Sequence, residues 1–354
     1  MARLGVVLPA QDPNLSARDL VELAHRIEAA GYTSVYLPEA WCWDALAVLS
    51  GIAMATERVE IGTAIVTLPV RTPALTAMGA LTVDSLSNGR HVLGLGTGHR
   101  RLVETWHGLE FEPRLQRMRE YVEIVRGIVA REDMHYEGRY YRCVDGRLDV
   151  EPLRRRIPIY VAALGLETMK LAGEIADGLL PYYATPDYVV RCVEAVAEGA
   201  RRAGRDPADV EIALMVPTWV TDEPAAAREV ARSQIAWYNN FEFYNRMFRA
   251  AGFVEEADAL RDAWARVNAD PELRDRWGES RDLEGSDAGT AALVSDAMVD
   301  SIFAIGSAEE CRAQIESSRA LDVGQPLIFP QGQYTSREEA LAGFGRTIDA
   351  IAPA

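Results

Sequence analysis

Short apolar runs alternate with longer amphipathic segments along the whole chain. The first apolar run, 3–9, is followed by a helical pattern over 16–31, in which Ser16 is a suitable N-cap and Gly31 follows the helix end. Each later run of strand length is also separated from the next by helical material. Strands are therefore predicted at 3–9, 33–39, 59–66, 91–97, 157–163, 178–183, 210–220 and 325–331.

This alternation predicts an α/β protein in which a parallel sheet closes into a (β/α)8 TIM barrel. An open, doubly wound sheet is the alternative. We favour the barrel because the strands continue along the whole chain without a linker, so that residues 1–354 are expected to form one domain. A hairpin or irregular excursion is expected over 134–156.

A large insertion, expected to be helical and to cover about 225–320, separates the seventh and eighth strands. It contains aromatic residues at helical spacing, which predict one helix face: Trp237, Phe241, Tyr244 and Phe248. The favoured interpretation is packing against the barrel, with a substrate lid or a dimer contact as alternatives. An insertion on the strand-to-helix side would lie over the active site of a barrel.

Composition and charge narrow the range of functions that the chain could have. The 354 residues include 53 acidic and 37 basic side chains, and the formal charge of −16 disfavours nucleic acid and anionic membranes as partners. Lys170 is the only lysine, so Schiff-base, pyridoxal phosphate and Walker-type chemistry would all have to use it. The four cysteines form no CxxC pair, and no signal peptide or membrane span is evident, so a cytoplasmic protein is expected.

The stretch "RHVLGLGTGHRR" raises the question of a nucleotide loop. A dinucleotide fingerprint would need its third glycine at position 99, where the chain has His99. Alternating glycines in a strand leave one face bare, which allows a ligand to approach the backbone closely. Thr97 and Gly98 are therefore candidates to offer a hydroxyl and a backbone N–H to an anion.

A metal site is not expected. His99 and His107 are eight residues apart, which does not place them on one helix face, and no carboxylate accompanies them in a ligand spacing. His25 and His135 are isolated, and His91 begins a buried strand, where a structural role is the default.

Three stretches resemble the luciferase-like (bacterial luciferase) superfamily, and within it the oxidoreductases that use the deazaflavin coenzyme F420. They are "IGTAIVTLPVRTPALTAMGALTVDSLSNGRHVLGLGTG", "VETWHGLEF" and "IPIYVAALGLETMKLAGEIADGLLP". The resemblance covers nearly the whole chain in order. It implies an F420-dependent enzyme, often dimeric, although FMN-dependent monooxygenases share the barrel.

The resemblance also implies positions for the cofactor. In members that use F420, the third strand ends in a bulge with a non-prolyl cis peptide behind the deazaflavin ring, and Ala64 and Ile65 match it. Glu39 matches a residue at the pyrimidine edge of the ring. Thr97, Gly98 and Gly165 match residues near the phosphate-bearing tail, while Asp177 and Gly178 are expected to hold a turn.

Two departures from the sugar-phosphate dehydrogenase branch concern proton chemistry. Ala40 stands where that branch has a histidine, and His99 stands where it has a glutamate. His99 is therefore the first candidate for an acid or base, with Glu104 second. The remaining candidates are expected to line the substrate cavity or to pack: Trp41, Trp43, Trp106 and His107.

These observations predict hydride transfer between C5 of the deazaflavin and a small organic substrate. Without lysines to clamp a phosphate, an uncharged and partly apolar substrate is expected. An FMN-dependent monooxygenase working with a partner reductase is the alternative, and a non-catalytic protein that binds flavin or deazaflavin is a third hypothesis. A homodimer is expected, and the Phe241 to Phe248 stripe is one candidate contact.

Overall fold

The computed structural model describes residues 3–112, 115–269 and 289–353. Within them, eight parallel strands pair in a closed ring, which confirms the (β/α)8 barrel and excludes the open sheet. In ring order the strands are β1 Gly5–Val7, β2 Ser34–Leu37, β3 Glu60–Thr63, β5 His91–Gly96, β8 Ile159–Val161, β9 Gly178–Leu179, β10 Glu211–Val220 and β12 Gln325–Pro330.

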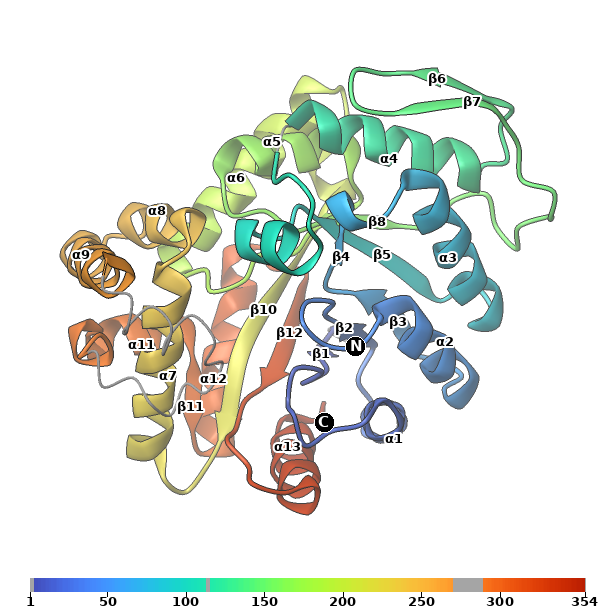
Figure 1. Cartoon of the computed structure of the whole chain (residues 1–354). Coiled ribbons are helices and arrows are strands. Elements are labelled where there is room, and N and C mark those ends of the chain that lie inside the picture. The colour runs from blue at the N-terminus through green and yellow to red at the C-terminus, as the bar shows by residue number, and fades with distance from the viewer. Residues whose placement is uncertain (1–2, 113–114, 270–288, 354) are drawn as a thin grey trace.

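Helices cover the outside of the ring (Figure 1). They are α1 Ala17–Ala29, α2 Ala45–Ala55, α3 Pro73–Leu86, α4 Leu115–Val129, α5 Leu166–Ile175, α6 Pro186–Arg202 and α13 Arg337–Ile351. The sequence signals at the first helix hold, because Ser16 and Asp19 form a reciprocal capping box and Gly31 follows with a positive φ of 89°. The expected hairpin consists of β6 Met134–Glu137 and β7 Arg142–Gly146.

The insertion between β10 and β12 gathers on one side of the barrel, opposite α1 to α3 (Figure 1). Its helices are α7 Pro224–Asn239, α8 Glu242–Ala250, α9 Val254–Ala269, α11 Asp296–Ile302 and α12 Ala308–Ser317. Residues 270–288 of the expected insertion lie outside the described residues. The insertion also contains β11, Ala304–Gly306, which pairs in parallel with the last residues of β10 and which the sequence pattern does not predict.

The aromatic stripe does not lie on one helix, so this prediction is wrong. The helix breaks at Asn240 and Phe241, so Trp237 lies on α7 while Tyr244 and Phe248 lie on α8. Phe248 is fully buried within the chain, and the other stripe residues contact one another and their neighbours. The structure therefore supports the packing interpretation, most clearly for Phe248, whereas Trp237, Phe241 and Tyr244 are half-buried and their role as a lid or a dimer contact stays a prediction.

The barrel interior is filled by apolar side chains and closed at the amino ends of the strands. There Arg3 forms ion pairs with Glu60 and Glu211, and the hydroxyl of Tyr160 donates to Glu211. At the opposite, carboxyl ends of the strands, several interior side chains are only half-buried: Ala64, Ile65, Ala162, Tyr182 and Phe329. This end, the mouth of the barrel, is where TIM barrels place their ligands.

Candidate active site at the barrel mouth

The face left bare by the alternating glycines of β5 is covered by the third strand, with Thr63 against Gly94 and Ile65 against Gly96. Gly62 pairs with Val92 and Val66 pairs with Leu95, so the third strand has one residue more than β5 between these pairs. The extra residue makes a bulge that continues into β4, Val66–Thr67. The sequence does not show that this bulge fills the bare face.

Direct contacts fix the bulge against β5. A Cβ on Gly94 would lie 1.9 Å from the carbonyl oxygen of Thr63, so only glycine fits. The Thr63 hydroxyl donates to the Gly94 carbonyl at 2.7 Å and accepts from its N–H at 2.8 Å. The peptide bond between Ala64 and Ile65, inside the bulge, is cis. Its contact with a cofactor stays a prediction.

Beyond the bulge, Gly98 turns the chain with a positive φ of 65° and packs on Thr67. The Thr97 hydroxyl donates to the Gly98 carbonyl at 3.3 Å, so it is engaged locally. The Thr67 hydroxyl, in contrast, is buried and has no hydrogen-bond partner among the described residues. Sequence analysis did not single out Thr67, because a strand threonine gives no signal of this kind.

Gly165 marks an open helix end. It is the N-cap of α5, with no side-chain cap and no atom within 4 Å of the position that a Cβ would take. Unpaired N–H groups at the first turn of a helix attract anions. Lys170, farther along this helix, is engaged by Glu167 at 3.1 Å and Glu198 at 3.2 Å.

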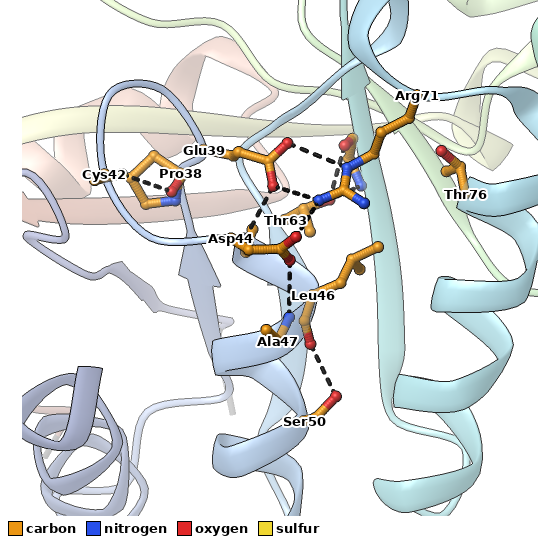
Figure 2. A network of polar contacts seen from close by, with 12 residues as sticks. Pro38, Glu39, Cys42, Asp44, Leu46, Ala47, Ser50, Thr63, Arg71 and Thr76 are labelled. Carbon is orange, nitrogen blue, oxygen red and sulfur yellow. Dashed lines mark hydrogen bonds and ion pairs between the residues drawn. The ribbon is translucent and has the colours of Figure 1, made fainter.

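The Glu39 carboxylate takes part in a network of hydrogen bonds and ion pairs within the chain (Figure 2). Its carboxylate accepts from the backbone N–H of Ala45 at 3.0 Å and pairs with Arg71 at 3.1 Å. Arg71 also binds Asp44, whose side chain caps α2 through the N–H of Ala47. Burial opposes the charge of Asp44, but these hydrogen bonds hold its pKa below the usual value. Glu39 therefore fixes the loop before α2, and contact with a cofactor is an additional role to be tested.

His99 lies between two aromatic rings. Its ring centroid is 4.7 Å from that of Trp41 and 4.6 Å from that of Phe241. Nδ1 lies 3.3 Å from the backbone nitrogen of Leu102, whose N–H it accepts, so a neutral ring carries its proton on Nε2. Burial, together with the charge of Arg101, lowers the pKa of His99 to about 4. The imidazole is therefore neutral at pH 7 and offers an Nε2–H donor.

Not all of the candidate residues that follow His99 in the sequence lie against its ring in the structure. Leu102–Trp106 is a π-helical turn in which the N–H of His107 bonds to the carbonyl of Leu102. Glu104 is half-buried and paired with Arg100. Trp106 is 62% exposed and His107 is also exposed, so the structure does not bring either into the half-buried stack of Trp41, His99 and Phe241. Trp43 is 42% exposed, and only Trp41 of that pair contacts the stack.

Two tyrosines that sequence analysis did not single out, Tyr182 and Tyr238, extend the group of aromatic rings around His99. We call this extended group the aromatic wall. The Tyr182 ring contacts the rings of Tyr183, Tyr238 and Phe329, and Tyr238 contacts Phe241. The signal in the sequence was the pair "YY" directly after the apolar run "GLLP" of the sixth strand. The wall therefore joins the sixth strand, the insertion and the His99 stack.

Comparison with known proteins identifies the family. The sequence profile described as luciferase-like monooxygenase matches residues 2–323, and the chain therefore belongs to this family. A Mycobacterium tuberculosis protein, provisionally named a coenzyme F420-dependent oxidoreductase, is 32% identical over 327 residues, covering 87% of this chain and 89% of that relative.

Two other relatives match along nearly their whole length. The 5,10-methylenetetrahydromethanopterin reductase of Methanolobus tindarius is 26% identical and covers 97% of this chain and 98% of its own. The solved structure of the coenzyme F420-dependent tetrahydromethanopterin reductase of Methanopyrus kandleri superposes with a TM-score of 0.75 at 22% identity, covering 98% of both chains. In the described part of the chain, no helix has the length and apolar character needed to cross a membrane.

Proposed function

We propose that the chain is an F420-dependent oxidoreductase that transfers a hydride between C5 of the deazaflavin and a small, uncharged organic substrate. The relatives named above support the cofactor, and the observation that carries the proposal is the combination of an apolar ledge and polar anchors at the barrel mouth. The ledge consists of the half-buried residues Ala64, Ile65, Ala162 and Phe329.

The residues at this mouth fit a planar ring that bears a polar, phosphate-containing tail. The ledge suits one face of the ring, and the orphaned Thr67 hydroxyl supplies a buried donor or acceptor beside it. Ala162 of the ledge leads, within three residues, to the open helix end at Gly165, which suits a phosphate. Thr97 and Gly98 lie on the turn that packs on Thr67. Bound F420 supplies two-electron hydride exchange, and the protein supplies orientation and a dry surface.

His99 is proposed to donate a hydrogen bond from Nε2 to the reacting oxygen of the substrate. A neutral imidazole with a low pKa is a poor proton donor but a good stationary donor to an oxygen that gains negative charge. Glu104, which Arg100 neutralises, is proposed as a secondary candidate at the rim. The substrate contacts are proposed to come from Trp41 and the aromatic wall, whereas Trp43, Trp106 and His107 are left as rim positions.

The experiment is a titration of the purified protein with F420 and with FMN, followed by quenching of each chromophore. We expect tight binding of F420 and weak binding of FMN. Thr67→Val should weaken F420 binding about fivefold or more, because it removes a buried hydroxyl that has no hydrogen-bond partner among the described residues. Thr82→Val, which removes an exposed hydroxyl of α3 bonded to the Met78 carbonyl, is the matched control. Preference for FMN would instead support the monooxygenase alternative.

The role of His99 is tested separately, by pH. Because its pKa is lowered, ionisation of His99 should affect kcat/KM only below about pH 5, and the rate should be flat with respect to this group from pH 6 to 8. His99→Asn keeps an acceptor for the Leu102 N–H and removes the ring donor. A limb near pH 6.5 that disappears in this variant would contradict the neutral-donor role.

We further propose a cytoplasmic homodimer formed through α2 and α3. None of the four cysteines forms a disulfide in the structure, which suits a reducing compartment. The outer faces of these two helices expose Met54 at 71%, Leu75 at 51% and Met78 at 55%. Light scattering should give a dimer for the wild type and a monomer for Met54→Glu combined with Met78→Glu. Val150→Glu, at an exposed residue outside these helices, should remain dimeric.

A further inference from the structure

The His99 ring contacts two aromatic rings that come from distant parts of the chain. The ring of Trp41, from the loop after β2, lies 4.7 Å from the imidazole between centroids, at an interplanar angle of 47°. The ring of Phe241, from the insertion, lies 4.6 Å away at 39°. Each contact places apolar carbon where water would otherwise solvate the imidazole. The surroundings of His99 therefore depend on the insertion as well as on the barrel.

Phe241 occupies the break between α7 and α8. Its backbone is extended, with φ −88° and ψ 125°, and it directly precedes α8. Its N–H donates to the carbonyl of Tyr238 in α7 at 3.0 Å, and its carbonyl accepts the N–H of Asn245 in α8 at 3.1 Å. The ring of Trp237 meets the Phe241 ring nearly at a right angle, with centroids 4.8 Å apart. Both the backbone and the side chain of Phe241 are thus held by the insertion.

Two buried asparagines fix this break to the next helix. Asn239, 2% exposed, and Asn245, 8% exposed, both donate from their side-chain amides to the carbonyl of Ala257 in α9, at 3.1 and 2.7 Å. The Asn245 amide also donates to the Asn239 side chain at 3.2 Å. Buried amides that lose their partners are costly, so these bonds resist displacement of the three helices relative to one another. A rigid part of the insertion therefore presents the Phe241 ring to His99.

The apolar cover is the main influence on the ionisation of His99. Burial, followed by the charge of Arg101, lowers the pKa of His99 to about 4. Tyr238, which also contacts Phe241, is neutral because burial raises its pKa to about 12. The acidic groups on the neighbouring segments form ion pairs: Glu104 with Arg100, Glu39 and Asp44 with Arg71, and Glu242 with Arg246.

We propose that Phe241 is a positioning residue, whose ring fixes the His99 imidazole and excludes water from it, so that the insertion completes the hydrogen-bond donor of the barrel mouth. This inference rests on the proposed function, in which Nε2 of the neutral ring donates to the reacting oxygen. A solvated histidine titrates at about 6.5 and is charged in a large fraction of molecules between pH 6 and 7. Contact with Phe241 keeps His99 the same neutral donor over this range.

The test follows the ionisation of His99 in the full chain without cofactor, by proton NMR titration of the histidine Cε1–H signals. The chain has five histidines, and the His99 signal is the one absent from His99→Asn. We expect this signal to titrate only below about pH 5 in the wild type. Phe241→Ala should raise the pKa of His99 by about one pH unit or more, because water then reaches the ring. Phe241→Tyr keeps the ring and should restore the low pKa.

Further variants keep the result interpretable. Phe243→Ala, at a 37% exposed ring of α8 outside the stack, is the matched control and should leave the pKa of His99 unchanged. If Phe241→Ala does not fold, Phe241→Leu decides, because leucine covers less of the imidazole and should raise its pKa by about half a pH unit. The other four histidines should titrate as in the wild type in every folded variant, a pattern that a general loss of structure would not give.

Three results would overturn the inference: an unchanged His99 pKa in the folded Phe241→Ala or Phe241→Leu variant, an equal rise in Phe243→Ala, or a wild-type His99 that titrates near pH 6.5. The outcome is separable from that of the cofactor titration. A raised His99 pKa in Phe241→Ala, without F420 binding by the wild type, would retain Phe241 as the residue that holds His99 and reject the proposed oxidoreductase. F420 binding with an unchanged pKa would retain the oxidoreductase and reject the role of Phe241.

Discussion

Glu28 is a buried carboxylate that fixes the turn between α2 and β3, and its replacement tests how the barrel is held together. The side chain comes from α1 and accepts the backbone N–H groups of Glu57, Arg58 and Val59 at 3.0, 2.6 and 2.9 Å. Glu28 is 7% exposed. One carboxylate therefore accepts hydrogen bonds from three consecutive backbone N–H groups in a segment that belongs to neither a helix nor a strand.

The size of the stability loss depends on which backbone N–H donors lose their acceptor. In Glu28→Ala, the N–H of buried Val59 is left without a partner, which costs about 1–3 kcal/mol. Glu57 and Arg58 are exposed, so water can replace their lost bonds at about 0.5 kcal/mol each. We expect the unfolding free energy to fall by about 2–4 kcal/mol at pH 7. Glu28→Gln keeps one acceptor oxygen and should cost about half as much.

The assay is urea unfolding of both variants across pH. Burial opposes the charge of Glu28, but the three backbone hydrogen bonds outweigh it, so the pKa is lowered in the folded chain. A lowered folded pKa gives stability that is fully present above the unfolded value of about 4.3 and is lost as the pH falls through the folded pKa. The difference between wild type and Glu28→Gln should thus be constant from pH 6 to 8 and shrink below about pH 4.3.

The control for this prediction is Glu194→Gln, at an exposed position of α6, which should change stability by less than about 0.5 kcal/mol. A loss below about 0.5 kcal/mol for Glu28→Ala would refute the reasoning, because the three N–H groups would then be satisfied without the carboxylate. A difference that does not change down to pH 3 would show that charge is not what matters.

Three further predictions follow from single contacts. Gly94→Ala should lower the unfolding free energy by about 3 kcal/mol, because its Cβ would meet the Thr63 carbonyl, whereas Gly165→Ala has open space and should change it by less than about 0.5 kcal/mol in urea unfolding. Asp19→Asn should cost about 1 kcal/mol at pH 7. The Arg337 hydrogen bond lowers the pKa of Asp19 to about 2, so this difference should vanish as unfolding is measured toward pH 2. Trp106→Ala, at an exposed rim residue, should leave F420 quenching and unfolding unchanged within error.

The fold could be predicted well because a parallel sheet covered on both faces produces continuous apolar strands at regular intervals. The misses have physical causes. β11 has only three residues and pairs with the end of β10 alone, so it is too short to show a period. The break at Asn240 is hidden because α7 and α8 both direct aromatic residues into one cluster, and the helical spacing continues across the break.

The positions of several site residues could be predicted from the sequence, but the residues that they contact could not. Sequence reasoning located Glu39 and the β5 glycines, yet it did not show that Arg71 pairs with Glu39 or that the Thr63 bulge covers Gly94. These partners lie about 30 residues away, and no local pattern links them. Tyr183 was overlooked for a similar reason, since its hydroxyl meets Gln234 only once α7 lies against the sixth strand.

The two halves of the barrel contribute different parts of the mouth. Apart from Phe329, the ledge comes from residues 64–165, as do the Thr67 hydroxyl and the open end of α5, whereas most of the aromatic wall comes from 182–244. His99 lies where the halves meet, since its ring touches Trp41 from the first half and Phe241 from the insertion. Under the proposed function, cofactor binding and substrate choice depend mainly on separate segments, and we expect a change in the insertion to alter the aromatic wall without moving Ala64, Ile65 or Ala162.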